Sequence, residues 1–248
     1  MTDYPITNNS HYFRREVTFD RDLQAHYQQQ QKGSYHVLDL ACGEGEFLKK
    51  QIQSLGTNGI HWYGLDLSPD LLFHAKQTLA DEWVMLSEGS ADALPYPDDS
   101  MNYISNRYSF HHFLNKRGVI REIWRVLKPG GMLKMTNRSV FDEANSWLYL
   151  YFPNAFFEDC NRYWSREMLF GAMQQMGFHV QIQLKVTMKL EPLRHLLYLA
   201  EMQAFSSLTR LSGRDYQSGL SMMREKLRKN PKSRIQTEQS EMILYARK

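Results

Sequence analysis

One stretch of this sequence constrains its fold more than any other: Val37-Leu38-Asp39-Leu40-Ala41-Cys42-Gly43-Glu44-Gly45-Glu46-Phe47. It starts with apolar residues typical of a buried strand, passes through a loop with two glycines, and enters a helical pattern of apolar residues. Glycines let the backbone pass close under a ligand, and the start of a helix offers free N–H groups. Parallel α/β sheets bind ligands beyond the carboxyl ends of their strands. The stretch therefore predicts a doubly wound α/β fold with a binding site at this loop.

The loop differs from two common nucleotide-binding motifs. The dinucleotide fingerprint has a third glycine three residues after the second, and the P-loop ends in Gly-Lys-Ser/Thr. Leu48 occupies the first of these positions, and the second motif is absent. Asp39 lies inside the predicted strand, where a carboxylate needs a cation or several N–H groups as partners. The loop therefore predicts neither a dinucleotide site nor a P-loop.

The sequence resembles class I S-adenosylmethionine (SAM)-dependent methyltransferases, whose first motif is similar to the segment from Leu38 to Gly45. The resemblance implies a Rossmann-like, seven-stranded, mostly parallel sheet with helices on both faces and an antiparallel last strand. It also implies that SAM is the cofactor. In that family the loop backbone, here Ala41, Gly43 and Gly45, lies against the methionine part of SAM. The strand carboxylate, here Asp39, supports its ammonium group.

A second acid follows the next predicted strand. Asp66 ends the strand that begins near His61, about twenty residues after the glycines. A doubly wound fold places an acid there to accept hydrogen bonds from the ribose hydroxyls. The alternative, that Asp66 caps the next helix, is weaker because Ser68 already provides an N-cap before Pro69. The resemblance also implies that Leu67 packs on the adenine.

The segment after the third predicted strand ends in Ala-Leu-Pro-Tyr, which resembles the adenine-binding loop of small-molecule methyltransferases. The resemblance places Ser90 and Ala91 against the adenine. The family's usual aspartate falls on Ser90, and Asp92 lies two residues later. A serine hydroxyl can accept a hydrogen bond from the adenine amine, so both Ser90 and Asp92 remain candidates.

The fourth predicted strand, Met101 to Ser105, leads into the segment that faces the methyl group in this family. The resemblance makes Asn106 a cofactor ligand, although Asn102 replaces the aspartate that the family usually has in the strand. His111 is the candidate general base, because a base is needed where the acceptor must lose a proton. A structural role for the His111-His112 pair is the alternative. Further candidates for the base are His112, Tyr108, His11 and Tyr12.

Several features place this catalytic unit within the chain. A helix is expected from about Asp20, and it would pack on the edge of the sheet. The alternative is that residues 1–33 form an N-terminal flap over the cofactor, whose Arg14 or Arg15 would meet the SAM carboxylate. The turn Leu127-Lys128-Pro129-Gly130-Gly131, another family feature, leads into the fifth strand. We predict a single methyltransferase domain over residues 1–248, with helical lids or insertions at about 139–164 and 188–236. The last strand covers Glu241 to Lys248.

Composition limits the class of protein. The chain of 248 residues has 42% hydrophobic and 23% charged residues and a net charge of +3, which is ordinary for a soluble globular protein and too small to argue for nucleic acid. Two cysteines suit a reducing cytoplasm. The polar residues 1–10 predict no signal peptide, and the apolar run from Trp147 to Phe157 is too short to span a bilayer. We predict a cytoplasmic protein with no metal site, and the sequence does not specify its oligomeric state.

Four functions compete for this chain. A small-molecule methyltransferase fits the nine aromatic residues between 141 and 164, from which we expect Trp147 and Phe156 to line an apolar acceptor site. A tRNA wobble-base methyltransferase is supported by the basic run from Arg224 to Lys229, which is more often a solvated helix face. Protein methylation would require a groove that the sequence does not show. A SAM-binding subunit without chemistry of its own is the non-enzymatic alternative.

Overall fold

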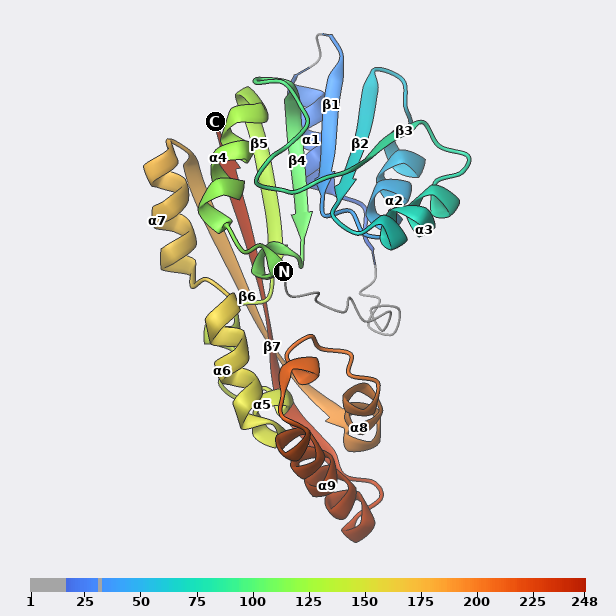
Figure 1. Ribbon diagram of the computed structural model, residues 1–248, viewed down its shortest axis with the longest axis vertical. Coiled ribbons are helices and arrows are strands. Elements are labelled where there is room, and N and C mark those ends of the chain that lie inside the picture. The colour runs from blue at the N-terminus through green and yellow to red at the C-terminus, as the bar shows by residue number, and fades with distance from the viewer. Residues whose placement is uncertain (1–16, 31–32) are drawn as a thin grey trace. The chain divides into compact units, whose positions relative to one another are not determined.

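The computed structural model describes residues 17–30 and 33–248, and these residues form one seven-stranded sheet with helices. The strand order is β3-β2-β1-β4-β5-β7-β6 (Figure 1). The strands are β1 Tyr35–Leu40, β2 Ile60–Asp66, β3 Val84–Glu88, β4 Met101–Arg107, β5 Leu127–Asn137, β6 His179–Pro192 and β7 Arg234–Arg247. Strands β3, β2, β1, β4 and β5 pair in parallel, and β7 pairs antiparallel with β5. The predicted fold class is therefore confirmed.

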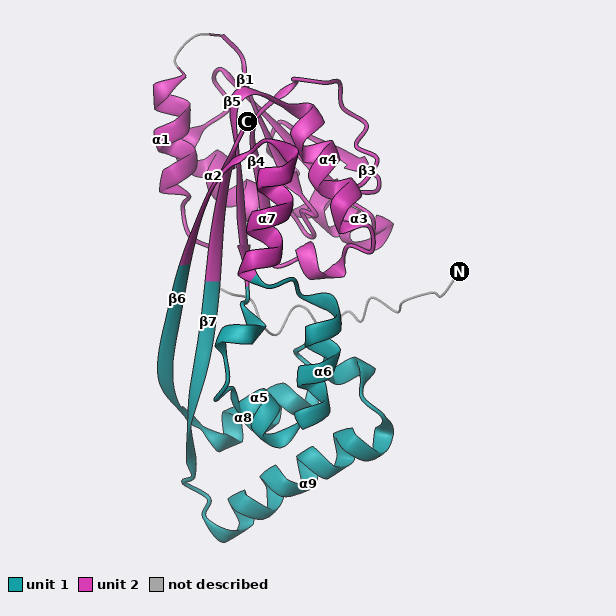
Figure 2. Ribbon diagram, turned by 90° about the vertical axis from the view of Figure 1, so that its left-hand side faces the viewer, with its two compact units in different colours: residues 1–16, 138–165, 184–241 teal, residues 17–137, 166–183, 242–248 magenta. Residues whose placement is uncertain are grey.

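The chain divides into two compact units (Figure 2). We call Val17–Asn137, Arg166–Gln183 and Met242–Lys248 the sheet unit, and Arg138–Ser165 with Leu184–Glu241 the helical unit. The helices of the sheet unit are α1 Arg21–Gln29, α2 Glu46–Leu55, α3 Pro69–Thr78, α4 Lys116–Val126, α7 Arg166–Met176 and the short 3-10 helix η2 Phe110–His112. Those of the helical unit are η3 Val140–Asp142, α5 Trp147–Tyr151, α6 Pro153–Arg162, α8 Leu193–Glu201, η4 Leu208–Arg210 and α9 Gly213–Lys229.

Helices cover both faces of the sheet in the sheet unit. Figures 1 and 2 show α1 on one face, and α4 and α7 on the other. Under α1, α2 and α3 lies a continuous apolar core, in which Leu23, Leu48 and Ala75 pack with Trp62 and Tyr103 of the strands. Alternation of apolar residues along strands and their 3.6-residue period along helices produce these faces. Packing of these faces fixes the register of the strands and therefore the positions of the loops that follow them.

Local sequence signals set the helix starts as expected. Asp20 caps α1 by accepting hydrogen bonds from the backbone N–H groups of Asp22 and Leu23 at 3.0 and 3.2 Å. Ser68 caps α3, with Pro69 at the first helical position. These side chains satisfy N–H groups that have no partner within the helix. None of the described helices is long and apolar enough to cross a bilayer.

Strand β7 begins seven residues earlier than expected, at Arg234 rather than Glu241. The extra segment contains Gln, Thr, Glu and Ser, which lack the apolar alternation that marks a strand. In the structure these polar groups have internal partners. The Thr237 hydroxyl oxygen accepts a hydrogen bond from the Trp147 N–H at 2.8 Å, and the Ser240 N–H donates to Glu143 at 2.9 Å. Such long-range pairing leaves no local sequence signal.

The two segments that we predicted as insertions belong to one unit with its own core. Apolar side chains of α5, α6, α8, α9 and β7 form that core: Trp147, Leu148, Tyr151, Phe152, Ala155, Leu193, Leu196, Leu199, Ala200, Leu208, Leu220, Met223 and Ile235. The prediction of a single domain with acceptor lids stays a prediction.

Trp147 lies inside this core rather than on a surface. Its side chain is 3% exposed, and its ring packs edge-on against Phe152 and Phe205 at centroid distances of 6.4 and 5.7 Å. Our expectation that Trp147 lines an acceptor site is therefore replaced by a structural role. The sequence did not distinguish a core aromatic from a lid aromatic, because both produce the same local composition.

Replacing Trp147 with alanine should destabilise the helical unit by about 3–5 kcal/mol, the usual cost of removing a buried aromatic ring. Limited proteolysis and chemical denaturation would measure this loss. Phe157 is the matched control, since it lies in the same segment but is 63% exposed. Equal resistance of the Trp147→Ala and Phe157→Ala variants to protease would contradict the core assignment.

Candidate cofactor site

The predicted cofactor residues meet at the carboxyl edge of the parallel strands. The register pairs Asp39 of β1 with Gly64 of β2 and with Ser105 of β4, and it pairs Leu40 with Asn106. The loop after β1, the end of β2 and the end of β4 therefore lie next to one another. This is the position at which doubly wound sheets bind their ligands.

The loop after β1 takes backbone conformations that favour glycine. Ala41, Gly43 and Gly45 all have positive φ angles, of 60°, 55° and 79°. The two glycines serve different purposes. A Cβ at Gly45 would lie 2.7 Å from Leu79 Cδ1, so a side chain there would have to displace Leu79 at the end of α3. A Cβ at Gly43 would meet no atom of the described residues within 4 Å. The backbone at Gly43 thus faces open space within the described part of the chain.

The Asp66 carboxylate ties this loop to the end of β2. Its Oδ2 accepts a hydrogen bond from the Gly43 N–H at 2.8 Å, and its Oδ1 accepts one from the Ser68 N–H at 3.0 Å. The backbone oxygen of Asp66 accepts another from the Gly89 N–H at 3.0 Å. Asp66 is 8% exposed. Since a carboxylate offers about four lone-pair sites, ribose hydroxyls can donate to those that remain.

Asp39 is the more deeply buried acid. The pKa of Asp39 is raised to about 7, mainly by burial and to a smaller extent by the nearby charge of Asp66. The Arg107 guanidinium and a hydrogen bond from Ser105 act in the opposite direction. Arg107, at the end of β4, also lies 4.9 Å over the ring of Phe47 in the first turn of α2. A cationic group bound beside Asp39 would stabilise its ionised form in the same way.

Asn106 is fully buried at the end of β4. Its Nδ2 donates to the Leu40 carbonyl at 2.9 Å and to the Ser109 hydroxyl at 2.6 Å. Its Oδ1 has no hydrogen-bond partner among the described residues. A buried acceptor without a donor is unusual in a folded protein. Together with the open space at Gly43, it shows that the residues present fit a polar ligand with donor groups, such as SAM.

The predicted adenine loop has both apolar and polar surfaces. Leu67 is 68% exposed, as a platform for a flat base would be, and Ala91 is 7% exposed. The Ser90 hydroxyl donates to Asp92, whose other oxygen accepts from Asn115 Nδ2 at 2.9 Å. These hydrogen bonds lower the pKa of Asp92, the one from Ser90 most strongly. Because the two side chains form one pair, the choice between Ser90 and Asp92 stays a prediction.

Glu122 and Arg125 hold this loop in place, a role that sequence analysis missed. Glu122 Oε2 accepts a hydrogen bond from the Leu94 N–H at 2.8 Å, and Arg125 donates to the carbonyls of Leu94 and Tyr96 at 3.0 and 2.8 Å. The two side chains are also paired with each other at 2.6 Å. The sequence signal for this role was an acid and a base three residues apart on α4. The same spacing is also common on an ordinary solvated helix.

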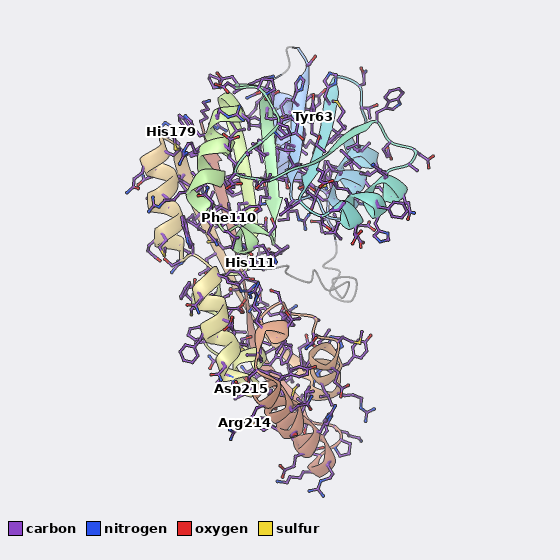
Figure 3. The ribbon with its side chains drawn as sticks, viewed as in Figure 1. Tyr63, Phe110, His111, His179, Arg214 and Asp215 are labelled. Carbon is purple, nitrogen blue, oxygen red and sulfur yellow. The ribbon has the colours of Figure 1, made fainter. Side chains whose placement is uncertain are left out.

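His111 lies on the 3-10 helix that follows β4, as Figure 3 shows. It is 7% exposed, and its ring lies 4.0 Å from that of the exposed His112. The preceding Tyr108 has a positive φ of 52°, which turns the chain away from the strand. A catalytic role for His111 stays a prediction. Residues His11, Tyr12, Arg14 and Arg15 lie outside the described residues.

Asn102, where the family usually has an aspartate, lies near the start of β4 and away from the strand ends that form the site. Its Oδ1 accepts hydrogen bonds from the His36 N–H at 2.9 Å and from Lys128 Nζ at 2.8 Å, and its Nδ2 donates to Gln30. The substitution therefore changes a structural contact at the amino-terminal edge of the sheet.

Part of the chain is similar in sequence to known methyltransferases. A family model described as a methyltransferase domain matches residues 38–135. A demethylmenaquinone methyltransferase of Listeria monocytogenes is 38% identical over 112 residues, which are 44% of this chain and 46% of that protein. The chain thus matches about half the length of this curated relative.

Two solved structures show a similar fold. The YcgJ protein of Bacillus subtilis has a TM-score of 0.63 and 18% identity, with 92% of this chain and 98% of that chain covered. Phosphoethanolamine N-methyltransferase 2 of Haemonchus contortus, in complex with S-adenosyl-L-methionine, has a TM-score of 0.56 and 19% identity, with 92% and 52% covered.

Fold and site define the class: this chain has the Rossmann-like fold of class I SAM-dependent methyltransferases. Residues 38–135, which contain the predicted ligands from Asp39 to Asn106, match the model of a methyltransferase domain. SAM is the cofactor of this class.

Replacing Asp66 with alanine should weaken SAM binding and also destabilise the protein, because the buried carboxylate accepts two backbone hydrogen bonds. Hydrogen bonds to a charged group contribute about 1.5–3 kcal/mol each. Calorimetric titration and chemical denaturation would measure both effects. An unchanged SAM affinity would contradict the assignment of Asp66 to the ribose.

Below about pH 7, SAM affinity should decrease as the pH is lowered, by up to tenfold per pH unit. The reason is that a bound ammonium group requires ionised Asp39. In the same range the free protein should gain stability as pH falls, since the pKa of folded Asp39 lies above its ordinary 3.8 and protonation favours the folded state. Calorimetry between pH 5.5 and 7.5 tests this, as α-amino groups with pKa values of about 7.7–8.0 stay mostly protonated there. Asp39→Asn should bind weakly at every pH. A flat profile for the wild type would refute the role of Asp39.

Replacing Gly43 with valine should abolish SAM binding, because the branched side chain would fill the open space beside the loop. The positive φ of 55° adds a cost of about 1–2 kcal/mol in stability. Gly56→Val is the matched control, since Gly56 also has a positive φ and open space but lies at the far end of α2. That control should lose stability and, when folded, still bind SAM in calorimetry. Tight binding by folded Gly43→Val would mean that the loop is only a turn.

Proposed function

We propose that this protein transfers the methyl group of SAM to a small, apolar or aromatic metabolite. The observation that carries the proposal is the set of buried polar groups at the strand ends, where Asp39, Asp66 and Asn106 surround the open backbone at Gly43. The name of the Listeria relative, a demethylmenaquinone methyltransferase, supports an apolar quinone-like acceptor. Both cysteines are free thiols, which supports action in a reducing cytoplasm.

Bound SAM supplies a methyl group on a sulfonium, which leaves as a neutral thioether. The protein then has to position the two reactants in line and exclude water. Asp39 holds the ammonium group, Asp66 orients the ribose, and Leu67 supports the adenine. His111 accepts the acceptor's proton where the acceptor carries one. The position of His111 on η2, shortly after β4, supports this role.

The basic helix gives the tRNA alternative less support than its sequence suggests. Two of the four cations in the run from Arg224 to Lys229 are already paired on the surface of the helical unit. Arg224 lies 2.7 Å from Glu201, and Lys229 lies 2.7 Å from Glu225. A surface that binds phosphates needs cations that are free to replace counterions. These ion pairs favour the interpretation that the basic run is a solvated helix face rather than a surface that binds tRNA.

The proposal is tested by incubating the protein with methyl-labelled SAM and three separate acceptor pools. The pools are the organic-soluble metabolites of a cell extract, a demethylated quinol, and bulk tRNA. Label should enter the organic-soluble pool and be lost in the Asp39→Asn variant. Label in tRNA that disappears when Arg224, Lys226, Arg228 and Lys229 are neutralised would instead establish the nucleic-acid function. SAM binding without transfer to any pool would favour a non-catalytic subunit.

A further inference from the structure

Strand β6 forms one edge of the sheet, and β7 is its only neighbour among the described residues. Residues 184–192 of β6 lie wholly within the helical unit. The end of this segment is joined to β7, since Leu193 N–H donates to the Ser233 carbonyl at 2.9 Å and Arg234 donates to the Leu190 carbonyl at 2.6 Å. The opposite side of the strand presents backbone N–H and C=O groups. An edge of this kind is a template for another strand.

The same segment exposes a row of apolar side chains. Val186, Met188 and Leu190 are 49%, 49% and 56% exposed. Because alternate residues of a strand share a face, the three side chains lie side by side on one face of β6. None of them belongs to the apolar core of the helical unit. Their exposure would be relieved by a second strand that carries apolar residues at matching positions.

The sequence of β6 supplies such a strand when two copies pair antiparallel about Met188. In that register Met188 lies opposite its own copy, and Val186 lies opposite Leu190. The exposed apolar residues of the two copies then form one continuous row across the pair. Cross-strand apolar pairs of this kind stabilise a sheet.

The other face of β6 is complementary in the same register. Lys185 lies opposite Glu191, which makes two opposite-charge pairs because of the twofold symmetry. Thr187 lies opposite Lys189. Moving the centre by one residue to Thr187 places Lys185 opposite Lys189, and moving it to Lys189 places that residue opposite itself. Like charges directly opposite are unfavourable, so the charge pattern favours Met188 over these two neighbouring centres.

We propose that this edge is a docking surface for a second copy of the chain, and that residues 184–192 of two copies pair antiparallel about Met188. The dimer extends the sheet through β6 and covers the apolar row of the helical unit. This inference is independent of the acceptor and of the chemistry at the cofactor site.

A charge exchange tests the register. Sedimentation equilibrium of the full chain should show a dimer. Glu191→Lys or Lys185→Glu should raise the Kd of this dimer about tenfold or more, because each change creates two like-charge pairs. The double variant K185E/E191K restores opposite charges and should restore the dimer. Lys226→Glu on exposed α9 is the control for net charge and should have no effect. A monomeric wild type, or a dimer that ignores both single changes, would overturn the proposal.

Cysteine cross-linking provides a second measurement that does not depend on the strength of the dimer. In a Cys160→Ser background, Met188→Cys should form a disulfide between copies under mild oxidation, because directly opposed residues have Cα atoms about 4.5–5.5 Å apart. Val186→Cys alone should not cross-link, but it should do so when mixed with Leu190→Cys. Cross-linking of Val186→Cys to itself in preference to Met188→Cys would exclude this register.

Discussion

The hydrogen bonds of the Asp66 carboxylate are the interaction on which the candidate cofactor site depends. It accepts hydrogen bonds from the loop after β1 and from the start of α3, and its backbone oxygen accepts one from the segment after β3. Three chain segments that are distant in sequence are therefore held at one point. A buried acid is stable there because N–H donors surround it. If Asp66 also binds the ribose, the ligand contacts a carboxylate that already holds these three segments together.

The other groups at this edge follow from the same arrangement. Parallel pairing of β1 and β4 places Asp39 and Asn106 on neighbouring strands at the same edge of the sheet. Both side chains are buried, so a ligand beside them would be a strong electrostatic or hydrogen-bonding partner. The pKa of Asp39 is raised to about 7 in the protein alone, and an ammonium group would lower it. Binding of an ammonium group beside Asp39 would therefore be coupled to the protonation of this carboxyl group.

The helical unit is held together by different forces. Arg138, Glu143, Asp159 and Arg162 form a buried, charge-balanced network, in which Arg138 lies 2.5 Å from Glu143 and Arg162 lies 2.6 Å from Asp159. Beside it, aromatic and leucine side chains form a separate core. Breaking a buried ion pair leaves an uncompensated charge. This unit is therefore a folded body with requirements of its own, and its exposed edge at β6 is where we place the contact with a second copy.

The sequence by itself determined the fold class and the residues around Gly43 and Asp66, because strand periodicity, glycine loops and helix caps are local signals. It did not determine the start of β7, the role of Trp147 or the clamp of Glu122 and Arg125 on the Leu94 loop. These depend on partners that are tens of residues away: Thr237 for Trp147, and Leu94 for Glu122. Local patterns record what a residue prefers, whereas burial and hydrogen-bond partners are set only when distant segments pack together. The tertiary structure therefore decided which aromatics are core, which charges are paired, and why Gly45 and Gly43 are glycines for different reasons.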